Sequence, residues 1–145
     1  RLNPSLERSL QEMAEQMSTP EELQELCRIL SQLSEEIVFA HTHLGSFTSG
    51  MRFLTAKPES ADADFMHDVT TAVDALDTIC EDVNVDISAG VYRSIGDEKT
   101  FGAACTALLI RIPFQRSHAI IGILGPLRMN YAKNMALLEA VTHNQ

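Results

Sequence analysis

Residues 107–126 have the sequence ALLIRIPFQRSHAIIGILGP, which contains two nearly unbroken apolar runs. The runs, 107–114 and 119–124, are separated by four polar residues that are suited to a hairpin loop. A Gly-Pro pair then ends the second run. This stretch therefore predicts two strands joined by a tight connection, and the rest of the fold is built around them.

A third strand is expected upstream of this hairpin. Apolar and polar residues alternate from Val83 to Val91, which is typical of a half-buried strand, and Gly96-Asp97 supplies a turn after it. The three strands follow one another without a helix between them. The sequence therefore predicts an α+β fold in which helices cover an antiparallel sheet.

Two amphipathic helices are expected before the sheet. Asn3-Pro4 begins the first helix, and the capping box Thr19-Pro20-Glu21-Glu22 begins the second, whose apolar spacing continues to about Ala40. We expect residues 1–44 to form a helical hairpin or arm that serves as a dimerisation element. Its apolar positions make up the candidate dimer face: Leu6, Leu10, Met13, Leu23, Leu26, Leu30 and Leu33.

Further helices are expected in the middle and at the end of the chain. Residues 45–57 are predicted to be a loop with a short helix or strand around 51–54, because glycines punctuate the segment. A helix capped by Ser60 or Asp62 is predicted to continue to about Asp82. Asn130 is expected to cap the last helix.

Composition and charge exclude several classes of protein. The 145 residues are 45% apolar and 21% charged, an ordinary globular mixture, and the net charge of −9 disfavours binding of nucleic acid by this chain alone. Residues 1–82 hold sixteen acidic and five basic residues, so the acidic character lies in the helical half. No stretch approaches the roughly 20 apolar residues of a membrane span. The chain begins with Arg1 rather than Met, and we expect it to be a piece of a longer protein.

Candidate catalytic and metal-binding residues are few. His41-Thr42-His43 could bring two imidazoles to a metal ion, but two ordinary loop histidines account for the pattern better. Cys105 precedes an apolar run, so a buried core position is favoured over a nucleophile. The three cysteines have no paired spacing and indicate buried thiols in the reducing cytosol. We therefore expect no catalytic residue, no cofactor and no metal.

Arg128 lies in the densest local pattern of the chain, between Pro126 and Asn130. A cation fixed in such a turn can bond to the carbonyls that end a strand, pair with an acid such as Glu98, or contact a partner or an anion. The first two uses are structural, and the residues favour them over the third.

The same segment resembles the C-terminal signature of the heat-inducible transcription repressor family HrcA. Ile121-Gly-Ile-Leu-Gly-Pro-Leu-Arg-Met-Asn-Tyr131 is similar to the family pattern, and Ile95-Gly96-Asp97-Glu98 and Lys57-Pro58-Glu59 resemble two upstream elements. The signature maps onto residues for which we expect a structural role: Gly125, Pro126, Arg128, Met129, Asn130 and Tyr131.

The resemblance implies a GAF-like regulatory domain over residues 45–145 and a DNA-binding winged helix upstream of this chain. It also implies a homodimer that represses chaperone genes through operator DNA, with activity supported by the chaperonin. Two alternatives remain open. The domain could sense a small molecule enclosed by the loop of residues 41–57, or it could be an interaction domain that docks a chaperone.

Overall fold

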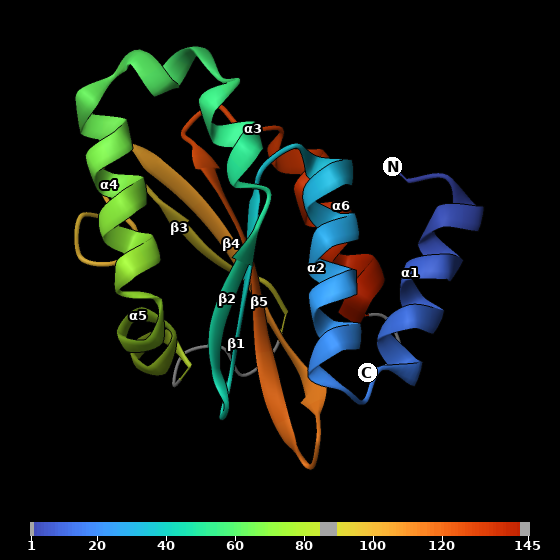
Figure 1. Cartoon of the computed structure of the whole chain (residues 1–145). Helices are drawn as coiled ribbons and strands as arrows, with labels where there is room; N and C mark the ends of the chain where they lie inside the picture. Colours follow the sequence, from blue (N-terminus) through green and yellow to red (C-terminus); the bar gives the residue numbers. More distant parts are fainter. Residues whose placement is uncertain (1, 85–89, 143–145) are drawn as a thin grey trace.

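The computed structural model describes residues 2–84 and 90–142, and its centre is a five-stranded sheet (Figure 1). The strand order is β2-β1-β5-β4-β3, and each pair of neighbours is antiparallel. The strands are β1 (Ile37–Thr42), β2 (Gly45–Ser49), β3 (Tyr92–Ile95), β4 (Cys105–Phe114) and β5 (Ser117–Pro126). Helices cover this sheet, so the predicted α+β class with an antiparallel sheet is confirmed.

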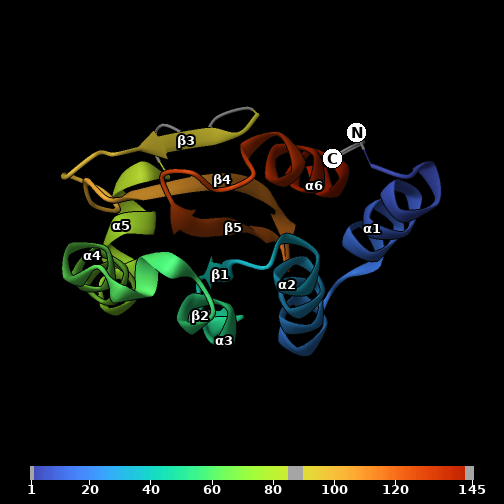
Figure 2. The same ribbon diagram turned by 90° about the horizontal axis from the view of Figure 1, so that it is seen from above.

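Helices cover both faces of the sheet, as Figure 2 shows from above. One face carries α2 and α6, with α1 as an outer layer beyond them, and the other face carries α4 and α5. The helical elements are α1 (Pro4–Gln16), α2 (Pro20–Ser34), α3 (Met51–Thr55), η1 (Pro58–Ala61), α4 (Ala63–Asp74), α5 (Leu76–Val83) and α6 (Tyr131–Thr142).

Alternation along β5 divides the buried side chains between two cores. Ile121 and Ile123 pack with α2 and α6, whereas Ile120 and Leu124 pack with α4 and α5, because successive strand residues point to opposite faces. Gly122 has no side chain on the second face, and the Phe39 ring occupies the place where a Cβ atom would lie. Both faces of the central strand are therefore buried, which explains its nearly continuous apolar sequence.

The two strands predicted from residues 107–126 are confirmed as β4 and β5. Their ten-residue ladder extends from Cys105↔Pro126 to Phe114↔Ser117, which is longer than the apolar runs. The connection has two residues instead of four, because Ser117 and His118 already belong to β5. Both turn residues, Gln115 and Arg116, have positive φ angles of 49° and 63°.

The second helix ends earlier than predicted. α2 stops at Ser34, and Glu35 adopts a left-handed conformation with φ 56° and donates its N–H to Ser31 O. The continuation of the apolar spacing to Ile37 was misleading, because β1 begins there and pairs with β2 and β5. A run of Ile, Val and Phe favours a strand that is paired on both sides. The segment 1–44, expected to be a helical arm, thus contains a strand of the sheet.

The middle of the chain also differs from the prediction. Residues 45–57 contain β2 and α3, so most of the expected loop is regular structure. The helix expected to reach Asp82 is interrupted at Ala75, where φ −106° and ψ 17° separate α4 from α5. The strand expected over 83–91 lies largely at positions 85–89, outside the described residues, and β3 begins at Tyr92.

Candidate functional site

The segment that resembles a family signature is a strand end, a turn and a helix start. β5 ends at Pro126, whose carbonyl accepts the Met129 N–H at 3.0 Å. Asn130 then caps α6, since its Oδ1 accepts the Lys133 N–H at 3.2 Å. The buried Asn134 donates its side-chain N–H to the Met129 sulfur at 3.3 Å. Met129 and Asn130 therefore hold the start of α6 against the turn.

Arg128 projects from this turn and pairs with an acid on a distant segment. Its Nη2 donates to Glu59 Oε1 at 2.9 Å, and its Nε contacts Glu59 Oε2, so the guanidinium engages both oxygens. Pairing with an acid is thus confirmed, although the partner is Glu59 of η1 and not Glu98. Partial desolvation is the largest single effect on Glu59 and raises its pKa. The hydrogen bond from Arg128, a backbone hydrogen bond and the charges of Arg128 and Lys57 together outweigh it and leave this pKa below its ordinary value.

A second ion pair lies beneath the turn, and it was not predicted from the sequence. Glu36, between α2 and β1, is only 4% exposed, and its Oε1 lies 3.1 Å from Lys57 Nζ. Lys57 also donates to the Glu35 carbonyl at 2.8 Å. Burial raises the pKa of Glu36, and the nearby Lys57 and Arg128 only partly oppose this effect. The sequence held one signal for these two ion pairs, the run Lys57-Pro58-Glu59, which was noted only for its resemblance to the family. Lys57 is the partner of Glu36, and Glu59 is the partner of Arg128.

Gly125 is required by the buried carboxylate. A Cβ atom at this position would lie 2.5 Å from Glu36 Oε1, which is closer than side chains pack. The two ion pairs and this close approach connect the α2–β1 junction, the segment around η1 and the turn before α6. We call Glu36, Lys57, Glu59, Arg128 and Gly125 the clamp. Its groups are paired with one another, so the clamp is built to hold segments together rather than to react.

The structure brings together histidines that are remote in sequence. His41, His43 and His118 line one hollow of about 180 Å³, beside Cys80 and Glu81 of α5. His41 and His118 belong to neighbouring antiparallel strands, which explains how they come to share the end of one face.

The ring of His41 is already engaged within the chain. Its Nδ1 lies 2.8 Å from Ser46 Oγ and 3.0 Å from Asp77 Oδ1. Hydrogen bonding by Ser46, and then by His41, lowers the pKa of Asp77. Burial, followed by the charges of Arg111 and His41, lowers the pKa of His118. Among residues 2–84 and 90–142, no group of three His, Cys, Asp or Glu side chains is arranged to hold a metal ion.

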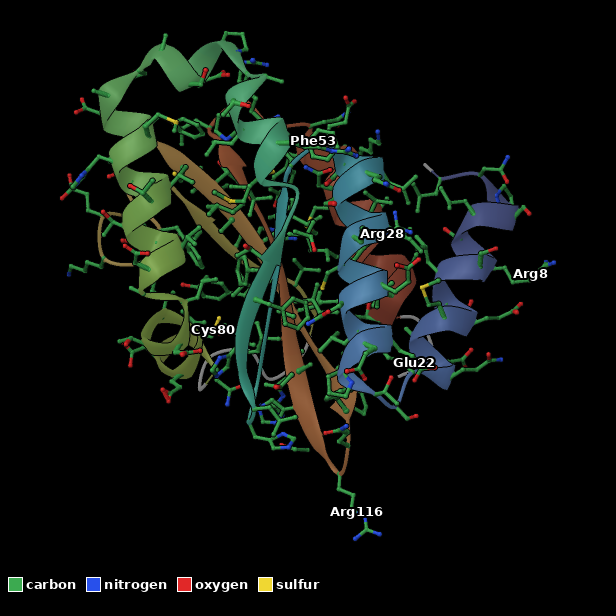
Figure 3. All side chains as sticks on the ribbon, in the orientation of Figure 1. Arg8, Glu22, Arg28, Phe53, Cys80 and Arg116 are labelled. Atoms are coloured by element: carbon green, nitrogen blue, oxygen red, sulfur yellow. The ribbon has the colours of Figure 1, made fainter. Side chains whose placement is uncertain are left out.

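The cysteines are core residues, as predicted. Cys27, Cys80 and Cys105 are free and buried, and burial raises the pKa of each thiol to about 12. Figure 3 shows Cys80 on α5 at the side of the sheet. A thiol with so high a pKa is not a thiolate at neutral pH, so the arrangement does not activate a nucleophile.

The candidate dimer face is largely interior to the chain. Leu10 of α1 and Leu23, Leu26 and Leu30 of α2 are buried in one core, which they share with α6 and one face of the sheet. The remaining members, Leu6, Met13 and Leu33, are half-buried around the same core. The stripe was correctly identified as apolar. The side chains of Leu10, Leu23, Leu26 and Leu30 are not available to a second chain, because other parts of their own chain cover them.

The segment 41–57, which the small-molecule alternative requires as a lid, is mostly regular secondary structure and not a loop. It contains the end of β1, the whole of β2 and α3, and Leu54 of α3 is buried in the core with α4. A segment held by a strand ladder and a core contact does not provide the freedom of a lid. The small-molecule alternative therefore loses the feature on which it depended.

One family matches most of the chain. The family described as "HrcA protein C terminal domain" matches residues 2–135. No curated protein sequence matches.

Two similar solved structures are transcriptional regulators of the IclR family. The one from Rhodococcus sp. is 16% identical with a TM-score of 0.46, and covers 97% of this chain and 66% of its own. The one from Brucella abortus is 15% identical with a TM-score of 0.44, and covers 97% and 67%. The chain thus spans about two thirds of the length of these structures.

Proposed function

The chain belongs to the family of HrcA C-terminal domains, and from this membership we propose that it is the regulatory domain of a repressor of chaperone genes. The observation that carries the proposal is the match over residues 2–135, which includes the signature segment and the clamp. The family is one of transcription repressors, and we assign no catalytic activity to the chain.

The proposal places DNA binding in a separate domain of the same protein. A net charge of −9 opposes contact with a phosphate backbone, so the operator would be bound by a basic domain that precedes this one. Two copies of the domain would set the spacing of two DNA-binding heads on an inverted repeat. An effector that binds the two forms of the dimer unequally then changes the affinity for operator DNA. Operator DNA changes the affinity for that effector by the same factor.

The proposed partner that reports stress is the chaperonin. Unfolded client proteins would draw the chaperonin away from the repressor and relieve repression. The proposed location is the cytosol, where three buried free thiols persist. None of the helices in the described part of the chain is long and apolar enough to cross a membrane.

The test is a pair of DNA-binding measurements. The full-length protein that contains this chain should bind an inverted-repeat fragment taken from upstream of chaperone genes, and purified chaperonin should strengthen that binding. The 145-residue chain alone should not bind the fragment at the same salt concentration. Equal binding by the chain alone, or no binding by the full-length protein with chaperonin present, would contradict the proposal.

A further inference from the structure

β2 is an edge strand that lacks the features by which proteins protect sheet edges. Its five residues, Gly-Ser-Phe-Thr-Ser from 45 to 49, include no charge and no proline. In Figure 1 this strand lies along the front of the molecule, and no other ribbon crosses it. Because edges are normally guarded by lysine, proline or a bulge, an unguarded edge is open to another strand.

The register of the β1–β2 hairpin shows which backbone groups face outward. Thr42↔Gly45 is the pair that closes the two-residue turn, and bonded and non-bonded pairs alternate from it along the ladder. Phe47 is therefore bonded to β1, whereas Ser46 and Thr48 direct their N–H and C=O groups away from it. Among the described strands, β2 has only β1 as a neighbour. Four backbone groups are thus presented along the edge.

Exposed apolar side chains flank this strand at both ends. Leu44 precedes it with 65% of its surface exposed, and Met51 follows it with 41% exposed. A hollow of about 440 Å³ lies beside Met51, between α3 and α2, and Arg28 and Arg52 line it. Figure 3 shows Arg28 on the α2 wall of this region and Phe53 on α3. One end of β2 thus carries a protruding leucine and the other end carries a hollow.

We propose that β2 pairs with β2 of a second copy of this chain, antiparallel about a two-fold axis at Phe47. In this register, Ser46 of each copy lies opposite Thr48 of the other, and their outward groups form about four hydrogen bonds. Leu44 of each copy falls opposite Gly50 of the other, at the hollow beside Met51. A two-fold interface requires such a self-complementary surface. The inference rests on the proposed dimeric repressor and names the surface of that dimer.

Charge supports a second copy as the occupant. The Leu44 end of β2 lies near two acids of α5, since Asp77 contacts Ser46 and Glu81 shares a hollow with His43. The hollow at the opposite end carries Arg52, which stacks on Phe53 at 4.8 Å. Antiparallel pairing brings the acidic end of each copy to the basic end of the other.

Disulfide trapping tests the register. Phe47→Cys places two thiols at a directly opposed, non-bonded pair, with Cα atoms about 4.5 Å apart, and oxidised glutathione should convert the chain to a covalent dimer. Thr48→Cys is the matched control, because the two substituted positions then lie one residue to either side of the axis, beyond the reach of a disulfide. The three native cysteines are buried and should stay unreacted in both variants.

Polar substitution tests the surface without altering the strand. Leu44→Asp should raise the dimer dissociation constant, measured by sedimentation equilibrium, by about tenfold or more. Leu127→Asp is the matched control, since Leu127 is similarly exposed at 54% but lies in the turn before α6, and it should leave the constant unchanged. The helical circular dichroism of each variant reports whether it is folded.

Trapping by Phe47→Cys together with weakening by Leu44→Asp would establish the interface. A wild-type dimer that Leu44→Asp leaves intact, or that Thr48→Cys traps in place of Phe47→Cys, would overturn the proposed surface while the dimeric repressor stands. A chain that remains monomeric at roughly 100 µM would overturn the proposed surface, since the chain carries the whole of β2. Operator binding by the full-length protein is measured separately, so the proposed function has its own outcome.

Discussion

At the scale of the residue, the tip of the β4–β5 hairpin holds a conformation that side chains disfavour. Left-handed φ angles at Gln115 and Arg116 give the twist that a two-residue hairpin needs, but Asn and Gly adopt them more readily. Gln115 gains a contact in return, since its amide donates to the Ser18 carbonyl at 3.0 Å. Arg116 extends from the tip of the hairpin, away from the rest of the chain (Figure 3).

Replacing Arg116 by glycine should therefore stabilise the protein. Relief of the left-handed conformation outweighs the entropy that glycine adds to the unfolded chain, and we expect a gain of about 0.5–1 kcal/mol in the free energy of unfolding. Urea denaturation measures the change. Arg116→Ala removes the same side chain without relieving the backbone and should show no gain. A stability of Arg116→Gly equal to that of Arg116→Ala would refute the explanation.

Glu36 should make stability depend on pH. Its pKa is raised in the fold by burial, so between its ordinary and its raised value the folded state binds more protons than the unfolded state. The contribution of Glu36 to the free energy of unfolding is fully present below the ordinary pKa of a glutamate. It is lost as the pH rises through the raised pKa. In the Glu36→Gln variant the side chain has no proton to lose. The free energy of unfolding of this variant should therefore not show this part of the fall with rising pH.

The measurement is the free energy of unfolding of both proteins at several pH values from about 4 to about 7. The stability of Glu36→Gln relative to the wild type should increase as the pH rises. Parallel curves for the two proteins would show that the carboxyl group titrates alike in the folded and unfolded chains.

At the scale of the element, the capping box of α2 is a local feature with a measurable effect. Thr19 Oγ1 accepts the Glu22 N–H at 3.1 Å, and the Glu22 carboxylate accepts the Thr19 N–H at 3.0 Å. Thr19→Ala should lower the free energy of unfolding by about 1 kcal/mol, because a backbone N–H of the first turn loses its partner. Ser18→Ala, one residue before the cap, should change it much less. Thermal unfolding of the two variants compares them directly.

The starts of the four helices that begin at a side-chain cap could be predicted from the sequence, whereas the end of α2 could not. Asn3, Thr19, Asp62 and Asn130 each bond to a backbone N–H within their own first turn, so the signal is contained in a few residues. The end of α2 depends instead on β1 pairing with two strands that come later in the chain. Pairing of that kind is decided by tertiary structure, and the apolar spacing continued past it.

The candidate site was predicted in the same partial way. The strand end at Pro126, the turn after it and the cap at Asn130 follow from local sequence, and the structure has all three. The partners across the clamp, Glu59 to Arg128 and Lys57 to Glu36, are separated in sequence and meet only when the sheet has formed. No spacing rule connects them, and for this reason Glu98 was a reasonable but wrong choice of partner.

At the scale of the whole molecule, the two ion pairs of the clamp should differ in how much they contribute to the free energy of unfolding. Arg128 is 65% exposed in its side chain, and an exposed pair is worth roughly 0–1 kcal/mol. Lys57 faces a carboxylate that is 5% exposed, and removing the partner of a buried charge costs roughly 3–5 kcal/mol. Lys57→Met should therefore destabilise the protein several times more than Arg128→Met.

Chemical denaturation of the two methionine variants measures this difference, and equal losses would contradict it. Repression by full-length protein carrying Arg128→Met extends the comparison. A loss of repression by a variant of nearly normal stability would assign the guanidinium a role in contact with a partner, beyond its place in the clamp.

The placement of the three native thiols allows local opening of the fold to be measured in the unmodified protein. Cys27 belongs to α2, Cys80 to α5 and Cys105 to β4, so the sheet and the helical layer on each of its faces contain one buried thiol each, which a reagent reaches only when that layer opens. The chain has no tryptophan, and optical probes of its opening are otherwise scarce. Timed alkylation followed by mass analysis of peptides would rank the layers by their opening free energies, without a single engineered label.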